Sequence, residues 1–205
     1  MSSLVLLSGG LDSLLVMQRE SSMGRLGAAL FVNYGQPSAV QELSAAVRIA
    51  ERYRVELHTT ACPLQLGQMG AGDGAQVVPA RNLVLLSLAV NLADAKGHNV
   101  VCFGPNMDDR RDYADCTTGF VVALVHLLAT RAEAGPVSRV HIEAPIAHLT
   151  KAMVLRELVE SSAPMGLAWS CYRPNEQGRP CQVCASCEAL NKAARTVFPA
   201  SVHTV

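Results

Sequence analysis

A short run of serine, glycine and aspartate near the N-terminus, Ser8-Gly9-Gly10-Leu11-Asp12-Ser13, combines residue types that bind phosphate. It follows the apolar β-type run 4–7 and precedes a helical pattern at 14–17. The glycines let backbone N–H groups turn toward an anion, the serines add hydroxyl donors, and the helix start adds partial positive charge. The spacing is neither GxxxxGK[ST] nor GxGxxG. The order strand, glycine turn, helix favours a phosphate loop over an ordinary capped turn.

A group of cysteines near the C-terminus has the spacing of a metal site. Its members are separated by ten, three and three positions: Cys171, Cys181, Cys184 and Cys187. Four thiolates satisfy the tetrahedral preference of Zn²⁺ and leave no open coordination position, so we predict a structural zinc site. An iron–sulfur cluster is the alternative, because CxxCxxC also occurs in such proteins. The other cysteines, at positions 62, 102 and 116, are expected to be small buried residues.

Apolar β-type runs alternate with helical patterns along most of the chain. We expect strands at 4–7, 28–33, 55–59, 100–104 and 139–143. We expect helices from residue 14 and at 42–53, 82–95, 120–134 and 150–161, the last capped by Thr150. Strands separated by helices predict an α/β fold, a Rossmann-like doubly wound parallel sheet covered on both faces. The glycine-rich stretch 63–79 is predicted to be a loop or lid.

Ligands of such sheets bind beyond the C-terminal ends of the strands, at the point where the strand order reverses. Polar segments occur at these places along the whole sequence: 8–13, 34–36, 81–82, 104–116 and 145–151. The fold rule therefore predicts that these segments meet in one cleft.

Length and composition indicate a folded protein of one domain, with an α/β core at 1–165 and a zinc knuckle with a C-terminal helix at 166–205. Of its 205 residues, 50% are hydrophobic and 17% are charged, which argues against disorder. Lysine plus arginine equals aspartate plus glutamate, at 17 each, so we expect no nucleic-acid-coating surface.

The longest apolar run, 83–93, is too short to span a bilayer. An odd count of seven cysteines disfavours a disulfide framework, so we expect a cytoplasmic protein.

Several motifs together resemble one enzyme family. SGGLDS at 8–13 is similar to the pyrophosphate loop of ATP pyrophosphatases, which cleave ATP between the α- and β-phosphates. The other motifs, besides SGGLDS, are NYGQ at 33–36, VPARNLVLLSLA at 78–89, GPNMDDRRDYADC at 104–116, APIAHLTKAMVLREL at 144–158 and WSCYRPNEQGRPCQVCASC at 169–187. Through these motifs, nearly the full length of the chain resembles the 7-cyano-7-deazaguanine synthase family. The resemblance implies a structural zinc and a tendency to dimerise. It also implies an ATP-dependent ligase that adenylates 7-carboxy-7-deazaguanine and uses ammonia to form the amide and then the nitrile.

The resemblance also implies roles for individual residues. ATP phosphates and magnesium are assigned to Ser8, Gly9, Gly10, Leu11, Asp12 and Ser13. Catalytic roles are assigned to Asp12 and to Lys151, whose alternative is an exposed lysine in a first helical turn. Substrate contacts are assigned to Tyr34, Gln36, Arg81, Asn82, Asn106, Asp109 and Asp115. The acids among them would pair with the N–H donors of a guanine-like base, and their alternative is simple solvation.

Three positions depart from the family pattern. Pro37 and Ser38 stand where the family usually has a basic residue and histidine, and Thr117 stands where it usually has arginine. We expect these positions to border the acceptor pocket, so the lost positive charge would weaken binding of a carboxylate. One alternative is therefore a paralogue that stops at the amide or joins a related acid to another amine. Another is a nucleotide-binding regulatory module without turnover.

Overall fold

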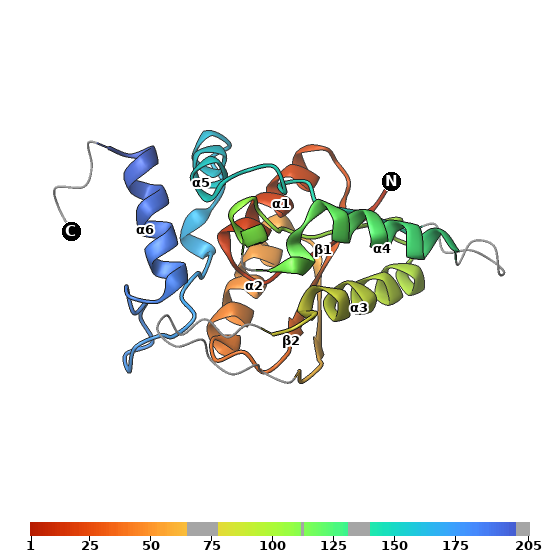
Figure 1. The fold of residues 1–205 in the computed structure, drawn as a ribbon, viewed down its shortest axis with the longest axis horizontal. Coiled ribbons are helices and arrows are strands. Elements are labelled where there is room, and N and C mark those ends of the chain that lie inside the picture. Colours follow the sequence, from red (N-terminus) through yellow and green to blue (C-terminus); the bar gives the residue numbers. More distant parts are fainter. Residues whose placement is uncertain (65–77, 112, 131–139, 200–205) are drawn as a thin grey trace.

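A five-stranded parallel sheet forms the centre of the molecule (Figure 1). The computed structural model describes residues 1–64, 78–111, 113–130 and 140–199. The strands are β1 (Ser3–Leu6), β2 (Leu26–Asn33), β3 (Glu56–Ala61), β4 (Val100–Cys102) and β5 (His141–Glu143). They lie in the order β3-β2-β1-β4-β5, and every pairing is parallel. The predicted doubly wound α/β fold is confirmed, and its strand order reverses at β1.

Helices cover both faces of this sheet. They are α1 (Leu11–Ser22), α2 (Ala39–Tyr53), α3 (Arg81–Lys96), α4 (Thr118–Thr130) and α5 (Lys151–Glu160), and α6 (Ala185–Val197) packs beside α5. Short 3-10 turns lie at Asp108–Arg111, Ala114–Cys116 and Met165–Leu167. Side chains of a strand alternate between faces, so Val5 joins the core beneath α1, α2 and α5, whereas Leu4 joins the core beneath α3 and α4.

The predicted elements are present, with small shifts at their ends. Helix α2 begins three positions earlier than expected, at Ala39, and β3 begins at Glu56 instead of Val55. Thr150 is confirmed as the cap of α5, because its side chain accepts a hydrogen bond from the Met153 N–H. Most of the predicted loop at 63–79 and the end of the predicted helix at 120–134 lie outside the described residues.

A buried ion pair joins the end of α1 to the sheet. The Glu20 side chain is 0% exposed, and the Arg25 guanidinium donates to its two oxygens at 3.1 and 2.7 Å. Arg25 also contacts Glu143 at 2.9 Å, at the end of β5. A buried carboxylate needs such a partner, since its desolvation is otherwise uncompensated.

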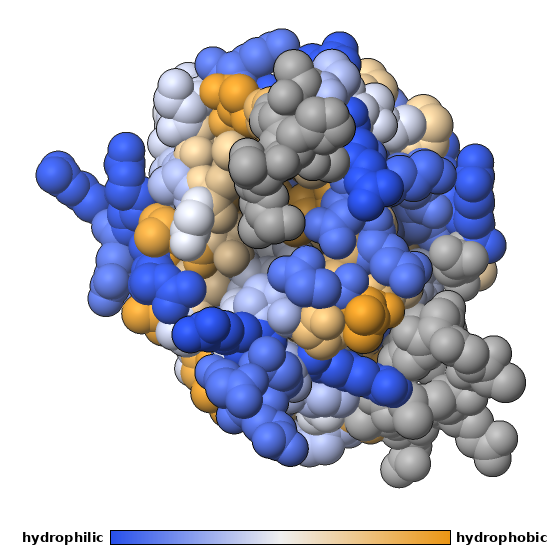
Figure 2. Space-filling model, turned by 90° about the vertical axis from the view of Figure 1, so that its left-hand side faces the viewer, coloured by the Kyte–Doolittle hydropathy of each residue, from blue (hydrophilic) through white to orange (hydrophobic). Residues whose placement is uncertain are grey.

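The C-terminal segment packs on the α/β core. Helix α6 lies beside α5 in Figure 1, and its Leu190 contacts the core shared by α1, α2 and α5. In the described part of the chain, no helix has the length and apolar character needed to cross a membrane. Figure 2 views the end of the molecule that carries α6, where hydrophilic residues predominate around smaller hydrophobic patches.

Candidate active site

The glycine loop that follows β1 has a conformation that requires glycine. Gly9 has a φ of +80°, and a Cβ there would lie 2.4 Å from the backbone oxygen of Glu42. Only glycine tolerates both the left-handed backbone and the close approach of α2. Ser13 Oγ donates to the Gly10 carbonyl at 2.9 Å and lies 3.2 Å from Ser8 Oγ. Both hydroxyls therefore cluster at the start of α1, as expected of an anion-binding loop.

Asp12 and Lys151 form an ion pair between the first turns of α1 and α5. Lys151 Nζ lies 2.5 Å from Asp12 Oδ2, and the lysine side chain is 18% exposed. Asp108 Oδ2 accepts a hydrogen bond from the Lys151 backbone N–H at 2.9 Å. Lys151 is thus held at the site and is not a solvated lysine of the helix surface.

The loop after β4 adds carboxylate and amide groups to the same place. Asn106 is 3% exposed, and its Nδ2 lies 3.5 Å from Asp12 Oδ1. Asp109 Oδ2 accepts a hydrogen bond from the Asn106 backbone N–H at 2.9 Å. Burial raises the pKa of Asp109 above its ordinary value, and the Asp12 carboxylate acts in the same direction.

An arginine of the same cavity lies close to two aromatic rings. The Arg81 guanidinium is 5.6 Å from the centre of the Tyr34 ring and 5.7 Å from that of Tyr113. Arg81 Nη1 also donates to Tyr34 Oη at 3.3 Å. Within the described ranges no ion pair joins Arg81 to a carboxylate, so its charge is stabilised by ring faces and stays available to an anion.

Two predicted substrate residues are used to build the start of α3. Asp115 Oδ2 accepts a hydrogen bond from the Asn82 N–H at 2.7 Å. The Asn82 amide in turn donates to the Asp115 carbonyl at 3.2 Å and to Cys116 Sγ at 3.2 Å. Asp115 therefore faces the backbone of α3, where it helps to position Arg81, and this placement does not support its predicted contact with a base.

One cavity of about 1050 Å³ joins these groups. Most of the predicted residues line it: Ser8, Gly10, Leu11, Asp12, Ser13, Tyr34, Gln36, Arg81, Asn82, Asn106, Asp109 and Lys151. Gly9 and Asp115 are not in its wall. The predicted convergence of distant segments at the C-terminal ends of the strands is thus observed. Such a cavity is large enough for a nucleotide and a second small molecule.

Sequence reasoning missed several residues of the cavity wall. Tyr113 and Tyr172 lie near Arg81, and α6 contributes Lys192 and Thr196. The two tyrosines stood inside the quoted motifs at 104–116 and 169–187, which was the signal available for them. Nothing in the sequence pattern pointed to Lys192, because its place depends on how α6 packs against the core.

The three departures from the family pattern have different surroundings. Ser38 is 2% exposed, and its hydroxyl donates to Glu42 Oε1 at 2.7 Å. Glu42 Oε2 accepts from Gln36 Nε2 at 2.9 Å, so one carboxylate orients both side chains. Pro37 and Ser38 line a small pocket of about 50 Å³ that also contains Arg81.

The expectation for Thr117 was wrong. Its hydroxyl accepts a hydrogen bond from the Phe120 N–H at 3.2 Å, which is the geometry of an N-cap of α4. Thr117 lines neither the large cavity nor the small pocket.

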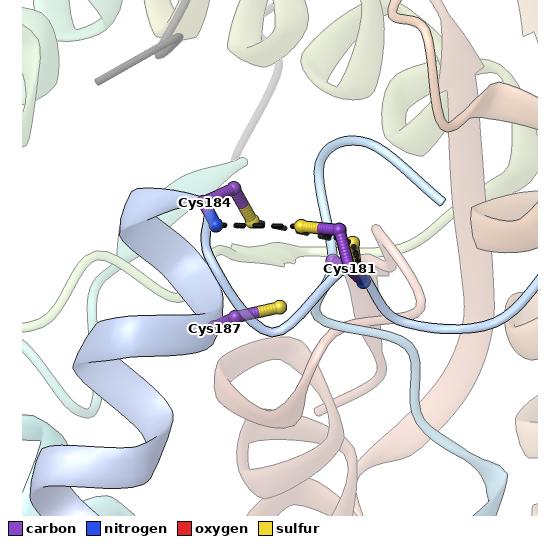
Figure 3. A group of neighbouring side chains, drawn as sticks. Cys181, Cys184 and Cys187 are labelled. Carbon is purple, nitrogen blue, oxygen red and sulfur yellow. Dashed lines mark hydrogen bonds between the residues drawn. The ribbon is translucent and has the colours of Figure 1, made fainter. Parts of the chain in front are cut away.

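The sulfur atoms of Cys171, Cys181, Cys184 and Cys187 all lie within 4.8 Å of one another. Figure 3 shows Cys181 and Cys184 on the loop before α6 and Cys187 in its first turn, with their sulfurs directed toward one space. The Cys171 and Cys181 sulfurs are 3.5 Å apart, and those of Cys171 and Cys184 are 4.0 Å apart. A tetrahedral ion with bonds of about 2.3 Å to sulfur separates its ligands by roughly 3.8 Å, so the set fits a single metal ion.

Backbone groups support these sulfurs. The Cys181 N–H donates to Cys171 Sγ at 3.2 Å, and the Cys184 N–H donates to Cys181 Sγ at 3.3 Å. A hydrogen bond from the Val183 N–H contributes most to lowering the pKa of Cys181 to about 7, whereas burial raises that of Cys187 to about 12. N–H donors stabilise a thiolate, which is the form that binds a metal.

Comparison with known proteins identifies the family. Residues 2–197 match the family described as Queuosine biosynthesis protein QueC. The chain belongs to the QueC family. A 7-cyano-7-deazaguanine synthase from Rhizorhabdus wittichii is 36% identical over 207 residues, covering 93% of this chain and 89% of the relative. One from Novosphingobium aromaticivorans is 39% identical over 205 residues, covering 90% and 86%. The expected family of ATP-dependent ligases is confirmed.

Solved structures support the fold of this QueC family member. The U34-tRNA thiolase NcsA from Methanococcus maripaludis has a TM-score of 0.55 at 15% identity, covering 100% of this chain and 73% of that one. A 4-thiouridine synthetase in complex with RNA and ATP has a TM-score of 0.53 at 14% identity, covering 96% of this chain and 50% of that one. At such identities the similarity concerns the fold alone, which is of the adenine nucleotide alpha hydrolase type.

Proposed function

We propose that this chain converts 7-carboxy-7-deazaguanine and ammonia to 7-cyano-7-deazaguanine at the expense of ATP. The main observation is one cavity, in a QueC family chain, that contains the glycine loop, the Asp12–Lys151 pair and Arg81, which forms no ion pair with a carboxylate among the described residues. The glycine loop and the Asp12–Lys151 pair suit a nucleoside triphosphate, and Arg81 suits a carboxylate beside a flat ring.

The chemistry needs activation because a carboxylate does not react with ammonia. The acid oxygen attacks the α-phosphorus of ATP, the α–β bridge breaks, and pyrophosphate leaves. Ammonia then displaces AMP from the acyl adenylate and gives the amide. A second adenylation of the amide oxygen lets AMP leave again, now with loss of the two amide protons, and the nitrile results.

The residues of the loop and of α5 act on the phosphates in this proposal. Ser8, Gly10 and Ser13 bind the pyrophosphate part through hydroxyl and N–H donors, and Lys151 places a positive charge beside it. Asp12 orients the Lys151 ammonium. Asp12 and Asp108 are also the oxygen donors that Mg²⁺ prefers, and bound Mg²⁺ would supply charge neutralisation at the phosphates.

Arg81 and the tyrosines form the acid-binding side. The guanidinium carries donors for a carboxylate, and the faces of Tyr34 and Tyr113 hold it in place. Pro37 and Ser38 line the small pocket that also contains Arg81, so the Arg81 guanidinium would supply positive charge beside these two uncharged positions. Asp109 and Asn106 would contact the N–H donors of the base, while Asn82 and Gln36 support the wall.

For the cysteine site we propose Zn²⁺ bound by Cys171, Cys181, Cys184 and Cys187. Four sulfurs within 4.8 Å of one another enclose the volume of one ion, whereas the four irons of a cubane cluster need more widely separated ligands. Full coordination by the protein leaves no position for substrate, so the proposed role is structural.

The decisive experiment is incubation of the purified protein with ATP, magnesium, ammonium and 7-carboxy-7-deazaguanine, followed by mass spectrometry. We expect the nitrile, with AMP and pyrophosphate formed in proportion. Accumulation of the amide alone would favour the paralogue alternative. Absence of ATP–pyrophosphate exchange with the acid would contradict the proposed function and favour a regulatory module.

We further propose that the protein is a cytoplasmic homodimer. The support is family membership together with exposed apolar side chains on α4, where Val122 is 48% and Leu127 is 58% exposed. Light scattering of the purified chain tests the oligomeric state, and a monomer at micromolar concentration would contradict it.

A further inference from the structure

The segment that leads into the cysteine site is hydrogen-bonded to the glycine loop. The Trp169 backbone N–H donates to the Gly9 carbonyl at 2.8 Å. The Trp169 indole Nε1 donates to the Cys171 carbonyl at 2.7 Å, and Trp169 packs against the cysteine cluster. Gly9, Trp169 and the first metal ligand are therefore joined by two consecutive hydrogen bonds.

The bond to Gly9 fixes the direction of one peptide plane. In a trans peptide the C=O and the N–H point to opposite sides. Because the Gly9 carbonyl is held by Trp169, the N–H of Gly10 is turned the other way, where Ser8 Oγ lies at 3.4 Å. Ser8 and Gly10 both line the cavity. The Gly9–Gly10 peptide plane is thus held with the Gly10 N–H on the side of the proposed phosphate site.

Without this bond the plane would be poorly determined. It lies between two glycines, which restrict rotation about the flanking bonds less than any other residues. A rotated plane would present a carbonyl oxygen to the phosphates instead of an N–H. Ordering the loop in advance lowers the entropic cost of binding an anion.

We propose that Trp169 is a positioning residue for the pyrophosphate loop, and that the loaded cysteine site acts through it on binding of the polyphosphate chain of ATP. This inference rests on the proposed function, because it presumes that the loop binds ATP. It gives the metal site a role in ligand affinity in addition to its role in folding.

The test compares Trp169→Phe with wild type and with Arg48→Met. Phenylalanine keeps an aromatic ring and the backbone N–H but removes the indole Nε1 donor that bonds Trp169 to the Cys171 carbonyl. Arg48 is the matched control, since its Nη2 donates to the Leu167 carbonyl at 3.2 Å and tethers the same segment two residues away from Trp169. Zinc content is measured for all three proteins, and calorimetry with magnesium present gives the Kd of inorganic pyrophosphate and of ATP.

We expect Trp169→Phe to retain its zinc and to bind both pyrophosphate and ATP about five- to tenfold more weakly, with Arg48→Met unchanged. Hydrogen exchange of the peptide that spans residues 4–13 should become faster in Trp169→Phe only. Weaker binding of ATP with unchanged binding of pyrophosphate would overturn the proposal, because it would mean that the Trp169 ring stacks on the adenine. Unchanged affinities at a lowered Tm, or equal weakening in Arg48→Met, would overturn it as well. Failure of wild type to bind pyrophosphate would instead refute the proposed nucleotide site.

Discussion

At the scale of single residues, the site depends on charges that are held in place before any ligand arrives. Asp12 and Lys151 are 139 positions apart in the sequence and still form an ion pair. The charge of Arg81 is held differently: the faces of two tyrosine rings contact its guanidinium, and no carboxylate of the described residues forms an ion pair with it. The first arrangement suits phosphate chemistry, and the second suits an anionic substrate.

Replacing Asp12 by alanine should leave the fold intact and abolish ATP-dependent adenylation. The Lys151 ammonium loses its partner, and the phosphates lose a carboxylate that would hold magnesium beside them. Pyrophosphate release measures this step, and circular dichroism checks the fold. Glu51→Gln, a change at an exposed residue of α2, is the control. Near-normal pyrophosphate release by Asp12→Ala would refute the assignment.

Arg81→Met should weaken the 7-carboxy-7-deazaguanine complex by roughly ten- to a hundredfold, as expected for loss of a charge-assisted hydrogen bond. The Kd of ATP should hardly change, because the contacts of Arg81 are with the rings of Tyr34 and Tyr113 and not with a residue of the glycine loop. Binding of each ligand is measured separately by calorimetry, with Arg52→Met on the outer face of α2 as control. Equal weakening of acid and ATP would argue against a specific role in acid binding.

At the scale of elements, two contacts stabilise the ends of helices that pack on the sheet. The buried pair of Glu20 and Arg25 fastens the end of α1, and Thr117 caps α4. Neither contact involves the cavity. Both should therefore influence stability and leave substrate choice unchanged.

Arg25→Met should lower the free energy of unfolding by about 3–5 kcal/mol, because Glu20 would remain buried without its partner. Urea unfolding followed by circular dichroism measures the loss. The double variant Glu20→Met with Arg25→Met should recover much of it, since the uncompensated charge is gone. A single variant as stable as wild type would mean that water reaches Glu20.

Thr117→Arg should not improve binding of the acid, contrary to the prediction that this position borders the acceptor pocket. The substitution removes the N-cap of α4 and should cost about 1 kcal/mol of stability. The KM for the acid and the free energy of unfolding are measured together, with Thr117→Ser as the conservative control. A lower KM in Thr117→Arg would place this position at the substrate after all.

At the scale of the whole molecule, the cysteine segment is part of the active site's architecture. It is attached to the core through α6, which packs beside α5, and through Trp169, which is bonded to Gly9. Helix α6 also brings Lys192 into the cavity wall. If the cysteines bind the proposed zinc, its loss should therefore affect the part of the cavity wall that Trp169 and α6 supply.

Elemental analysis should find close to one zinc per chain. Cys184→Ser should aggregate instead of giving a folded protein with a simple catalytic defect, because a polar segment with a small core of its own loses its metal. Cys62→Ser, at a half-buried cysteine outside the site, is the control. Iron with sulfide, or a well-folded preparation without metal, would contradict the zinc assignment.

The sequence by itself determined the fold class, the glycine loop and the cluster of four cysteines. Each of these depends on local order or on short spacing, as in 8–13 and in the cysteine spacing of ten, three and three. The alternation of strands and helices then limited the topology, so the meeting of distant loops at one edge could be expected from the rules for parallel sheets.

Only the tertiary structure decided which side chains of those loops face the cavity. Asp109 and Asp115 are equivalent as loop acids in the sequence, yet one lines the cavity and the other caps α3. The pairing of Asp12 with Lys151 and the bond from Trp169 to Gly9 also join residues far apart in the chain. Such contacts depend on how helices pack on the sheet, and that packing is set by many weak interactions that no local pattern records.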